Sequence, residues 1–323
     1  MRLFIYTFSH TRIGGIETFN SNVLREGLFD ECLSIYEMKL PKYLLFFKLI
    51  FLLLKADSVV LSHINLYPLA VIRFLMFKGK SKLIIHGKEV WQKLPYMALV
   101  SCVFIPVSSY TRNTVISRNS RNKISFGHNL YNCYSYDGTL HSHNIFTDDL
   151  NEILTVSRLD ASDNYKGIDQ IIKSVKILND LDVKVRLKIV GSGNDLPRLK
   201  AIVEELELGC VDFLGFVDDL VSQYQSNRIF ILPSSGEGFG IVFLEAMSAG
   251  MNIIALDKGA PFQFLKSYSG FFSVENQDES TLALAIRCAL VNRKIEVNKL
   301  SSVRILEKYN YENFKINSRR AIV

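Results

Sequence analysis

The strongest chemical signal in the sequence is a pair of acidic residues around a glycine-rich segment. Glu237 and Glu245 are eight residues apart, and glycine occupies three of the five positions 236–240. A strand is predicted at 229–232 and a helix at 241–249, so the glycines form a strand-to-helix turn that backbone amides could use to hold a diphosphate. The two carboxylates suit hydroxyl-rich partners such as a sugar and a ribose. A structural turn with a capping glutamate is the open alternative.

Two cations flank a second segment with compatible chemistry. Arg158 and Lys166 lie on either side of a loop after the strand predicted at 152–157. A guanidinium and an ammonium can neutralise the charge that builds on a departing nucleotide diphosphate. Gly191 ends another predicted strand, but Leu196 stands where a dinucleotide fingerprint needs its third glycine. The pattern disfavours a nicotinamide oxidoreductase, and an exposed surface charge pair is the alternative for the two cations.

These segments need elements that hold them, and strand-like runs alternate with helical patterns along the whole chain. Such alternation predicts an α/β protein with parallel sheets covered on both faces, and a ligand at the carboxyl ends of the strands. The polar residues 132–150, which include His141 and His143, are predicted to link two domains. Further strands are expected at 3–8, 58–62, 82–86, 102–107, 184–190, 211–214 and 252–256, helices at 167–178, 196–206 and 279–291, and one tail helix from about Ser301 with Tyr309 and Tyr311 near its middle.

Length and charge bound the class of protein. The 323 residues suffice for two domains, and the five scattered cysteines lack the spacing of a zinc site. The first residues are expected to form a strand and not a signal peptide. Residues 1–150 hold 17 Lys and Arg against 10 Asp and Glu, a net charge of +7, whereas residues 151–323 have a net charge of −1. The basic half indicates an anionic partner, with phosphorylated lipid, a membrane surface and nucleic acid all open.

The most apolar segment is 41–55, which is punctuated by Lys42, Lys48 and Lys55. It is shorter than the roughly 20 apolar residues that a bilayer-spanning helix needs. One interpretation is a buried helix of the first domain, and the other is a helix that docks on anionic lipid.

The segment from Glu237 to Gly250, EGFGIVFLEAMSAG, resembles the signature of the family 4 retaining glycosyltransferases of GT-B architecture. In that family two glutamates frame an E-G-F-G-x-x-x-x-E-A-M motif. The segments around Arg158 and Lys166 and the turn at Gly191 also resemble the family's pattern. The resemblance implies two doubly wound Rossmann-like domains facing across a cleft, with boundaries at 1–145 and 146–305 and a terminal helix, 306–323, that returns to the first domain.

The resemblance also implies roles for individual residues. Glu237 would contact the donor sugar, and Arg158 and Lys166 would stabilise the leaving diphosphate. His86, at the end of a predicted strand, would face the donor sugar or the acceptor hydroxyl, with a core or capping histidine as the alternative. Donor-binding residues would be Gly14, Gly15, Gly191, Gly238, Phe239, Gly240, Ile241, Val242 and Glu245.

By resemblance, the chain is expected to be a retaining hexosyltransferase that uses a nucleotide-diphosphate sugar, with a UDP-sugar as the expected donor. The acceptor would be a glycan or a polyprenyl- or lipid-linked saccharide in bacterial surface polysaccharide synthesis. No metal or other cofactor and no nucleic acid is expected, and Asp180-Leu-Asp182, which spells a metal-binding Asp-x-Asp, is interpreted as a solvated turn. The expected location is the cytoplasm, at the inner face of the plasma membrane. Alternatives are an NDP-sugar epimerase or hydrolase of the same fold and a non-catalytic sugar- or lipid-binding protein.

Overall fold

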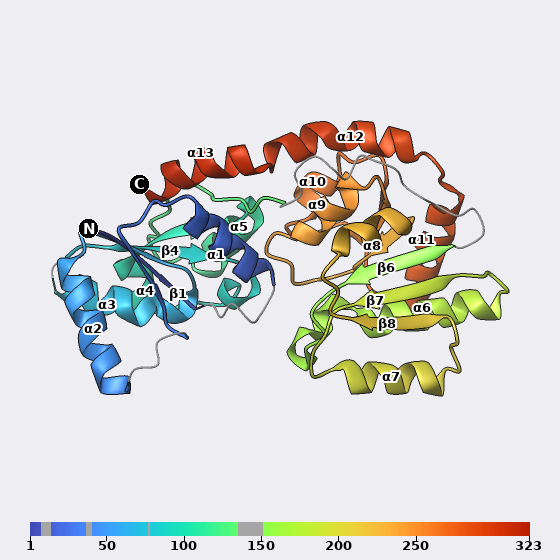
Figure 1. The fold of residues 1–323 in the computed structure, drawn as a ribbon, viewed down its shortest axis with the longest axis horizontal. Helices are drawn as coiled ribbons and strands as arrows, with labels where there is room; N and C mark the ends of the chain where they lie inside the picture. The colour runs from blue at the N-terminus through green and yellow to red at the C-terminus, as the bar shows by residue number, and fades with distance from the viewer. Residues whose placement is uncertain (8–13, 37–40, 77, 135–150) are drawn as a thin grey trace. The chain divides into compact units, whose positions relative to one another are not determined.

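The computed structural model describes residues 1–7, 14–36, 41–76, 78–134 and 151–323. The chain forms two compact units, one of Met1–Cys133 with Tyr309–Val323 and the other of Tyr134–Lys308 (Figure 1). Most of the predicted linker lies outside the described residues, as do His141, His143 and the boundary expected at residue 145.

The first unit is a parallel sheet between helices. Within its described residues the strand order is β2-β1-β3-β4-β5, and every neighbouring pair is parallel. The strands are apolar because helices cover both faces and leave no solvated side. Its strands are β1 (Arg2–Tyr6), β2 (Glu31–Ser34), β3 (Ser58–Leu61), β4 (Ser81–Ile85) and β5 (Cys102–Pro106). Its α-helices are α1 (Gly15–Arg25), α2 (Lys42–Lys55), α3 (Tyr67–Leu75), α4 (Tyr96–Ser101), α5 (Ser109–Arg118) and α13 (Tyr311–Ile322).

The second unit repeats this plan with more strands. Its described strands are ordered β11-β10-β9-β6-β7-β8, again all parallel. The strands are β6 (Glu152–Val156), β7 (Arg186–Val190), β8 (Val211–Gly215), β9 (Ile229–Ile231), β10 (Asn252–Leu256) and β11 (Phe271–Val274). The α-helices are α6 (Ile168–Asp180), α7 (Leu196–Glu205), α8 (Leu220–Ser226), α9 (Ile241–Ser248), α10 (Phe262–Leu265), α11 (Glu279–Val291) and α12 (Ile295–Lys308). This strand order is that of a doubly wound, dinucleotide-binding type of sheet. The two α/β sheets confirm the predicted fold class.

The C-terminal tail differs from the prediction. The single helix expected from Ser301 is wrong, because α12 ends at Lys308 and α13 begins at Tyr311. Asn310 interrupts the helix with an extended backbone, and its side-chain oxygen accepts a hydrogen bond from the backbone N–H of Asn313 at 2.9 Å. A side chain in this position caps a new helix, because it accepts a hydrogen bond from a first-turn N–H that has no partner within the helix.

The last helix, α13, is part of the first unit. Phe314 is 2% exposed, and its ring packs edge-on against Phe19 of α1 with centroids 5.8 Å apart. Lys82 of β4 donates from Nζ to the carbonyl oxygen of Ile322 at 2.7 Å. The chain therefore completes the first core with residues from both of its ends.

We predict that Phe314→Ala destabilises the first unit by about 3–5 kcal/mol, because it removes a buried aromatic ring and leaves a cavity. Chemical denaturation followed by circular dichroism measures the change. Ile316→Ala on the same helix is the matched control, since Ile316 is 48% exposed. Equal losses in the two variants would contradict the packing of α13 on α1.

Candidate active site

The candidate residues of the second unit lie where its strand order reverses. β6 and β9 are neighbours in the sheet, although they are separated by two strands in the sequence. Residues 157–166 leave the carboxyl end of β6, and residues 233–240 leave the carboxyl end of β9. Loops that leave adjacent strands in opposite directions open a crevice at this end of a doubly wound sheet, where ligands bind. The topology therefore brings the predicted cations and the predicted glutamate loop to one place.

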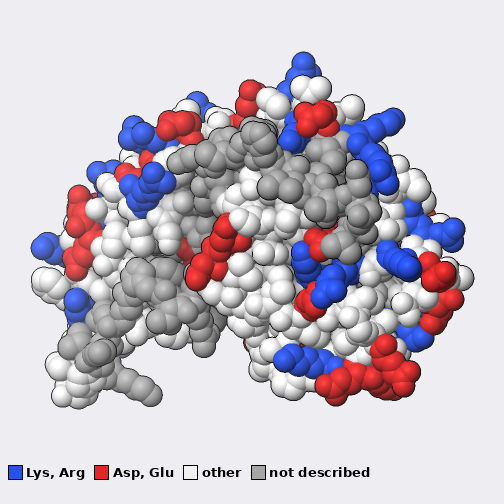
Figure 2. Space-filling view, turned by 45° about the vertical axis from the view of Figure 1, so that its right-hand side comes forward, with Lys and Arg blue, Asp and Glu red and all other residues white. Residues whose placement is uncertain are grey.

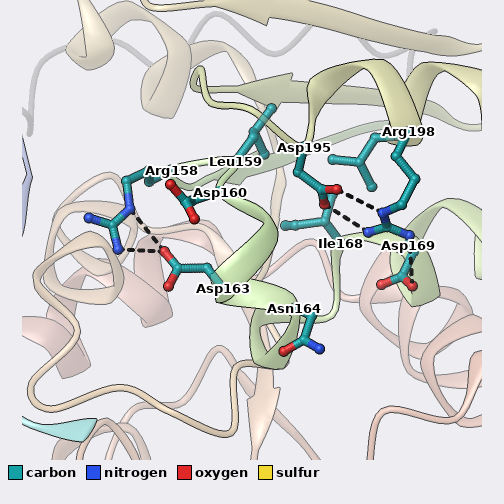
Figure 3. A pocket seen from close by; sticks show the side chains of 10 residues that line it. Arg158, Leu159, Asp160, Asp163, Asn164, Ile168, Asp169, Asp195 and Arg198 are labelled. Atoms are coloured by element: carbon teal, nitrogen blue, oxygen red, sulfur yellow. Dashed lines mark hydrogen bonds and ion pairs between the residues drawn. The ribbon is translucent and has the colours of Figure 1, made fainter. Parts of the chain in front are cut away.

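Asp163 holds the two predicted cations. Arg158 donates from Nε and Nη2 to Oδ2 of Asp163 at 2.9 and 2.7 Å, and Nζ of Lys166 lies 4.0 Å from the same oxygen (Figure 3). The Asp163 side chain is 7% exposed and that of Lys166 is 15% exposed, whereas the Arg158 side chain is 64% exposed. A buried carboxylate needs such partners. The two cations therefore lie against one buried acid, with Arg158 exposed and Lys166 largely buried.

A neighbouring ion cluster fixes the helices behind this loop. Arg198 of α7 donates from Nε and Nη2 to the two carboxylate oxygens of Asp195, both at 2.7 Å. Its Nη1 also lies 3.5 Å from Asp169 of α6. Figure 3 shows this cluster and the Arg158–Asp163 pair in one depression of the surface. Arg198 is thus held by two acids behind the loop, whereas Arg158 and Lys166 lie in the loop itself.

Residues 157–166, here called the cation loop, are hydrogen-bonded to residues 233–240, here called the glutamate loop. The side-chain amide of Gln277 donates from Nε2 to the carbonyl oxygens of Tyr165 and Pro233, each at 2.7 Å. The backbone N–H of Ser235 also donates to the Tyr165 carbonyl at 3.0 Å. The Tyr165 ring packs on Gly236 so closely that a Cβ there would lie 2.3 Å from it. Together these contacts fix the two loops relative to each other.

Glu237 follows directly in this fixed loop. Its side chain is half-buried. Burial, and then the nearby Glu237 carboxylate, raise the pKa of the Tyr165 phenol well above its ordinary value. Glu237 and the Asp163-bound cations thus lie in one electrostatic neighbourhood.

Gly191 lies against the backbone that carries Arg158. It has a φ of +136°, and a Cβ at this position would lie 1.8 Å from the carbonyl oxygen of Ser157. The backbone N–H of Ser157 donates to the carbonyl oxygen of Val190, and the backbone N–H of Leu159 donates to the carbonyl oxygen of Ser192. Only glycine permits this approach of the β7 turn to the β6 loop. In this structure Gly191 positions Arg158 through the main chain.

The other glycine-rich turn starts α9. Gly240 precedes the helix with φ +86° and ψ +61°, a left-handed conformation that favours glycine. Ile241 and Val242 are half-buried and form the first turn, where backbone N–H groups have no partner within the helix. Gly238 is half-buried, and Phe239 is buried with its ring 5.9 Å from that of Phe264. The turn therefore places the first-turn amides of α9 at the carboxyl end of β9.

Glu245 is buried inside α9 and is 8% exposed. Its Oε2 accepts a hydrogen bond from the phenol of Tyr224, a fully buried residue of α8, at 2.8 Å. Burial raises the pKa of Glu245 from 4.5 to about 7, and the bond from Tyr224 opposes that rise. A carboxylate is costly to bury. The hydrogen bond from Tyr224 thus fixes a buried hydrogen-bond acceptor, the Glu245 carboxyl group, in the helix that follows the glutamate loop.

His86 lies in the first unit, at the carboxyl end of β4. Its Nε2 is 2.7 Å from the carbonyl oxygen of Ser62, and because a carbonyl only accepts, that nitrogen carries the proton. The ring packs edge-on against Phe19 at 5.1 Å and lies 6.4 Å from the ring of His63. Burial lowers the pKa of His86. These contacts make it a buried, neutral histidine at the carboxyl ends of β3 and β4.

Gly14 and Gly15 begin α1 beside this histidine's partner Phe19. Gly14 has an extended backbone, and its carbonyl oxygen accepts a hydrogen bond from the Thr18 hydroxyl at 3.1 Å. A Cβ on Gly14 would lie 2.6 Å from a carboxylate oxygen of Glu17, whereas one on Gly15 would meet nothing within 4 Å. The turn that precedes them lies outside the described residues. The structure thus places the start of α1 here.

Sequence reasoning missed Asp163, Tyr224 and Gln277. Asp163 was recognisable, since an acid between two cations in one short loop indicates an ion pair. Tyr224 and Gln277 reach the site from elements 21 and 112 residues away from their partners in the chain, a separation that no local pattern reveals. The Asp180-Leu-Asp182 segment is an exposed turn at the end of α6, as predicted. Within the described residues, no three His, Cys, Asp or Glu side chains gather as a metal site would require.

Known proteins match this chain in sequence and in fold. A family model described as "Glycosyl transferases group 1" matches residues 139–303, just over half of the chain. A Campylobacter jejuni protein named N,N'-diacetylbacillosaminyl-diphospho-undecaprenol alpha-1,3-N-acetylgalactosaminyltransferase is 30% identical over 135 residues, 42% of this chain and 35% of that protein. The chain spans less than half the length of the first curated relatives it matches.

Two solved structures resemble the whole chain. The Anabaena protein HepE, crystallised with UDP and glucose, has a TM-score of 0.76 and 14% identity, and the match covers 98% of this chain and 97% of that one. WaaG, a glycosyltransferase involved in lipopolysaccharide biosynthesis, has a TM-score of 0.70 and 13% identity over the full length of both chains. These likenesses confirm the GT-B fold expected from the sequence.

We predict that Gly191→Ala destabilises the second unit by several kcal/mol, because the methyl group would clash with the Ser157 carbonyl in a backbone conformation that alanine avoids. The midpoint of thermal unfolding measures it. Gly209→Ala is the control, since a Cβ there meets nothing within 4 Å. Similar midpoints for the two variants would refute the close approach.

We predict a pH-dependent stability difference between wild type and Glu245→Gln. The folded protein holds the Glu245 proton more tightly than the unfolded chain, so this group stabilises the fold below about pH 4.5, and that contribution is lost as the pH rises to about 7. Relative to the variant, the wild type should lose roughly 3 kcal/mol of unfolding free energy across that range. Urea unfolding at pH 4.5 and pH 8 measures the difference, and a difference independent of pH would contradict the buried state of Glu245.

Proposed function

This chain belongs to the glycosyl transferases group 1 family and is a glycosyltransferase, and from that premise we propose its donor, its stereochemistry and its acceptor. The proposed donor is a nucleotide-diphosphate sugar whose nucleotide is UDP. The sugar is transferred with retention of anomeric configuration to a glycan or lipid-linked saccharide in bacterial surface polysaccharide synthesis. The observation that carries this proposal is the attachment of the cation loop to the glutamate loop through Tyr165 and Gln277.

The cation loop supports a diphosphate leaving group. Residues 157–166 hold two cations, Arg158 and Lys166, against two acids, Asp160 and Asp163, so the loop itself is formally neutral, and the Arg158 side chain stays 64% exposed. In the proposed reaction the bond between the anomeric carbon and the phosphate oxygen breaks, and these cations stabilise the diphosphate as its charge develops. The first-turn amides of α9, after Gly240, contribute on the other side. Cations and amides suffice for this task, so we propose a reaction without a metal.

The two glutamates support recognition of the donor's hydroxyl groups. Glu237, in the fixed loop, is proposed to orient the sugar, and Glu245 to accept from the ribose hydroxyls. Tyr224 holds one oxygen of Glu245, which leaves the other for the nucleoside. Gly14, Gly15 and His86 are proposed to contact the sugar or acceptor from the first unit, with the neutral ring of His86 near the attacking hydroxyl. We assign no covalent nucleophile.

The relatives support the choice of donor and acceptor. HepE was crystallised with UDP, and the Campylobacter relative is named for an undecaprenol-linked acceptor. WaaG is described as acting in lipopolysaccharide biosynthesis. We propose a related acceptor here, which would bring the protein to the inner face of the plasma membrane.

A donor screen tests the proposal. Thermal shift with UDP-, GDP- and dTDP-sugars, with and without EDTA, should show stabilisation by a UDP-sugar that EDTA does not remove. Product analysis by NMR should then show the donor's anomeric configuration in the product. Release or isomerisation of the sugar without any acceptor would identify a hydrolase or epimerase, and donor binding without turnover would identify a binding protein.

We predict that Lys166→Ala lowers kcat/KM for the donor by about 100-fold, because a preorganised cation at a developing charge contributes on that scale. Initial rates at varied donor concentration measure it. Lys200→Ala is the matched control, since Lys200 is an exposed lysine of α7. Wild-type rates in the Lys166 variant would remove this site from the mechanism.

A further inference from the structure

Helix α2 exposes bulky apolar side chains to solvent. Six of them are between 42% and 67% exposed: Tyr43, Leu44, Phe46, Phe47, Phe51 and Leu54. α2 lies at the edge of the first unit in Figure 1, and the described surface at the lower left of Figure 2 is mostly white, with blue groups beside it. The second unit differs, since its lower edge in Figure 2 carries blue and red groups. Exposed apolar patches of this kind mark interaction surfaces.

The exposed residues form a continuous line along the helix. Tyr43, Phe47, Phe51 and Leu54 are spaced by four, four and three residues, so they share one face, here called the apolar stripe. Leu49, Leu52 and Leu53, on the opposite side of the helix, are buried in the hydrophobic core of the first unit. α2 is therefore held by one apolar face and presents a second. The two interpretations of this segment from the sequence each describe one of its faces.

Positive charge accompanies the apolar stripe. Lys48 and Lys55 are exposed and seven residues apart, which places them together along one flank of the stripe. α2 contains no acidic residue. An apolar face bordered by lysines, whose long side chains reach headgroup phosphates while their methylenes stay apolar, is typical of helices that lie in the interface of an anionic membrane.

The geometry also fits a helix that lies on a membrane better than one that crosses it. At about 1.5 Å per residue, the 14 residues of α2 extend roughly 21 Å, less than the roughly 30 Å of a bilayer's hydrocarbon core. In the part of the chain that the structure describes, no helix is long and apolar enough to cross a membrane.

We propose that the apolar stripe of α2 inserts into the surface of an anionic lipid bilayer, with Lys48 and Lys55 at the headgroups. The inference deepens the proposed function, on which it rests for a lipid-linked acceptor. A second copy of the chain is a poorer occupant, because a two-fold contact through α2 would bring the same lysines of both copies together. The bilayer instead supplies the opposite charge, and its acyl chains accept the aromatic side chains.

Vesicle flotation tests the inference with the full chain. The wild type should float with vesicles of phosphatidylglycerol and phosphatidylcholine, and at least tenfold less with phosphatidylcholine alone. Phe47→Ser with Phe51→Ser should lower the partition coefficient on anionic vesicles at least tenfold. Leu284→Ser with Leu300→Ser is the matched control, since these side chains of α11 and α12 are 61% and 75% exposed, and it should bind as the wild type does.

A charge variant separates electrostatic attraction to anionic lipid from non-specific hydrophobic binding. Lys48→Glu with Lys55→Glu should remove the preference for anionic vesicles, whereas Lys200→Glu on α7 should keep it. Thermal midpoints and transfer to a water-soluble acceptor should match the wild type in all variants. Absence of transfer by the wild type itself would count against the proposed function and not against membrane docking. The inference is overturned if the wild type does not float, or if sedimentation velocity shows instead a dimer that the Phe47 and Phe51 substitutions dissociate.

Discussion

The buried carboxylate of Asp163 is the constraint on which the candidate site depends. At 7% exposure it would be unstable alone, and it draws Arg158 to 2.7 Å and Lys166 to 4.0 Å. The loop after β6 therefore folds around an ion cluster and cannot extend freely into solvent. The Arg158 side chain remains 64% exposed in this arrangement. The interaction that orders the loop thus leaves a guanidinium accessible to a ligand, as the proposed diphosphate chemistry requires.

Close backbone packing transmits this order to the rest of the site. Gly191 lets the β7 turn rest directly on the main chain before Arg158, and Gly236 does the same for the Tyr165 ring. Gln277 then joins the two loops by donating to both of their carbonyls. Because each contact is made by backbone or by a half-buried side chain, the positions of the cations relative to Glu237 depend on the rigid sheet and little on exposed side chains.

The first unit combines a protected interior with an exposed apolar surface. His86 is neutral and held between Ser62 and Phe19, while α2 contributes one face to a hydrophobic core of the same unit and leaves the other uncovered. Such a face costs solubility when no partner covers it, so its persistence on the surface is consistent with a partner outside the chain. The proposed lipid-linked acceptor and the membrane surface would then be reached by the same unit.

The sequence by itself determined the doubly wound α/β class, most strand positions and the glycine-rich turn that starts α9, because buried parallel strands appear as short apolar runs between turn residues. It did not reveal the edge strands β2 and β11, which are only four residues long, or the helix break at Asn310. Tertiary structure alone decided that Tyr224 meets Glu245 and that Gln277 joins two loops, since these partners are distant in the chain. It also decided which face of α2 enters the core, because a helix that is apolar on all sides carries no periodic signal to choose one.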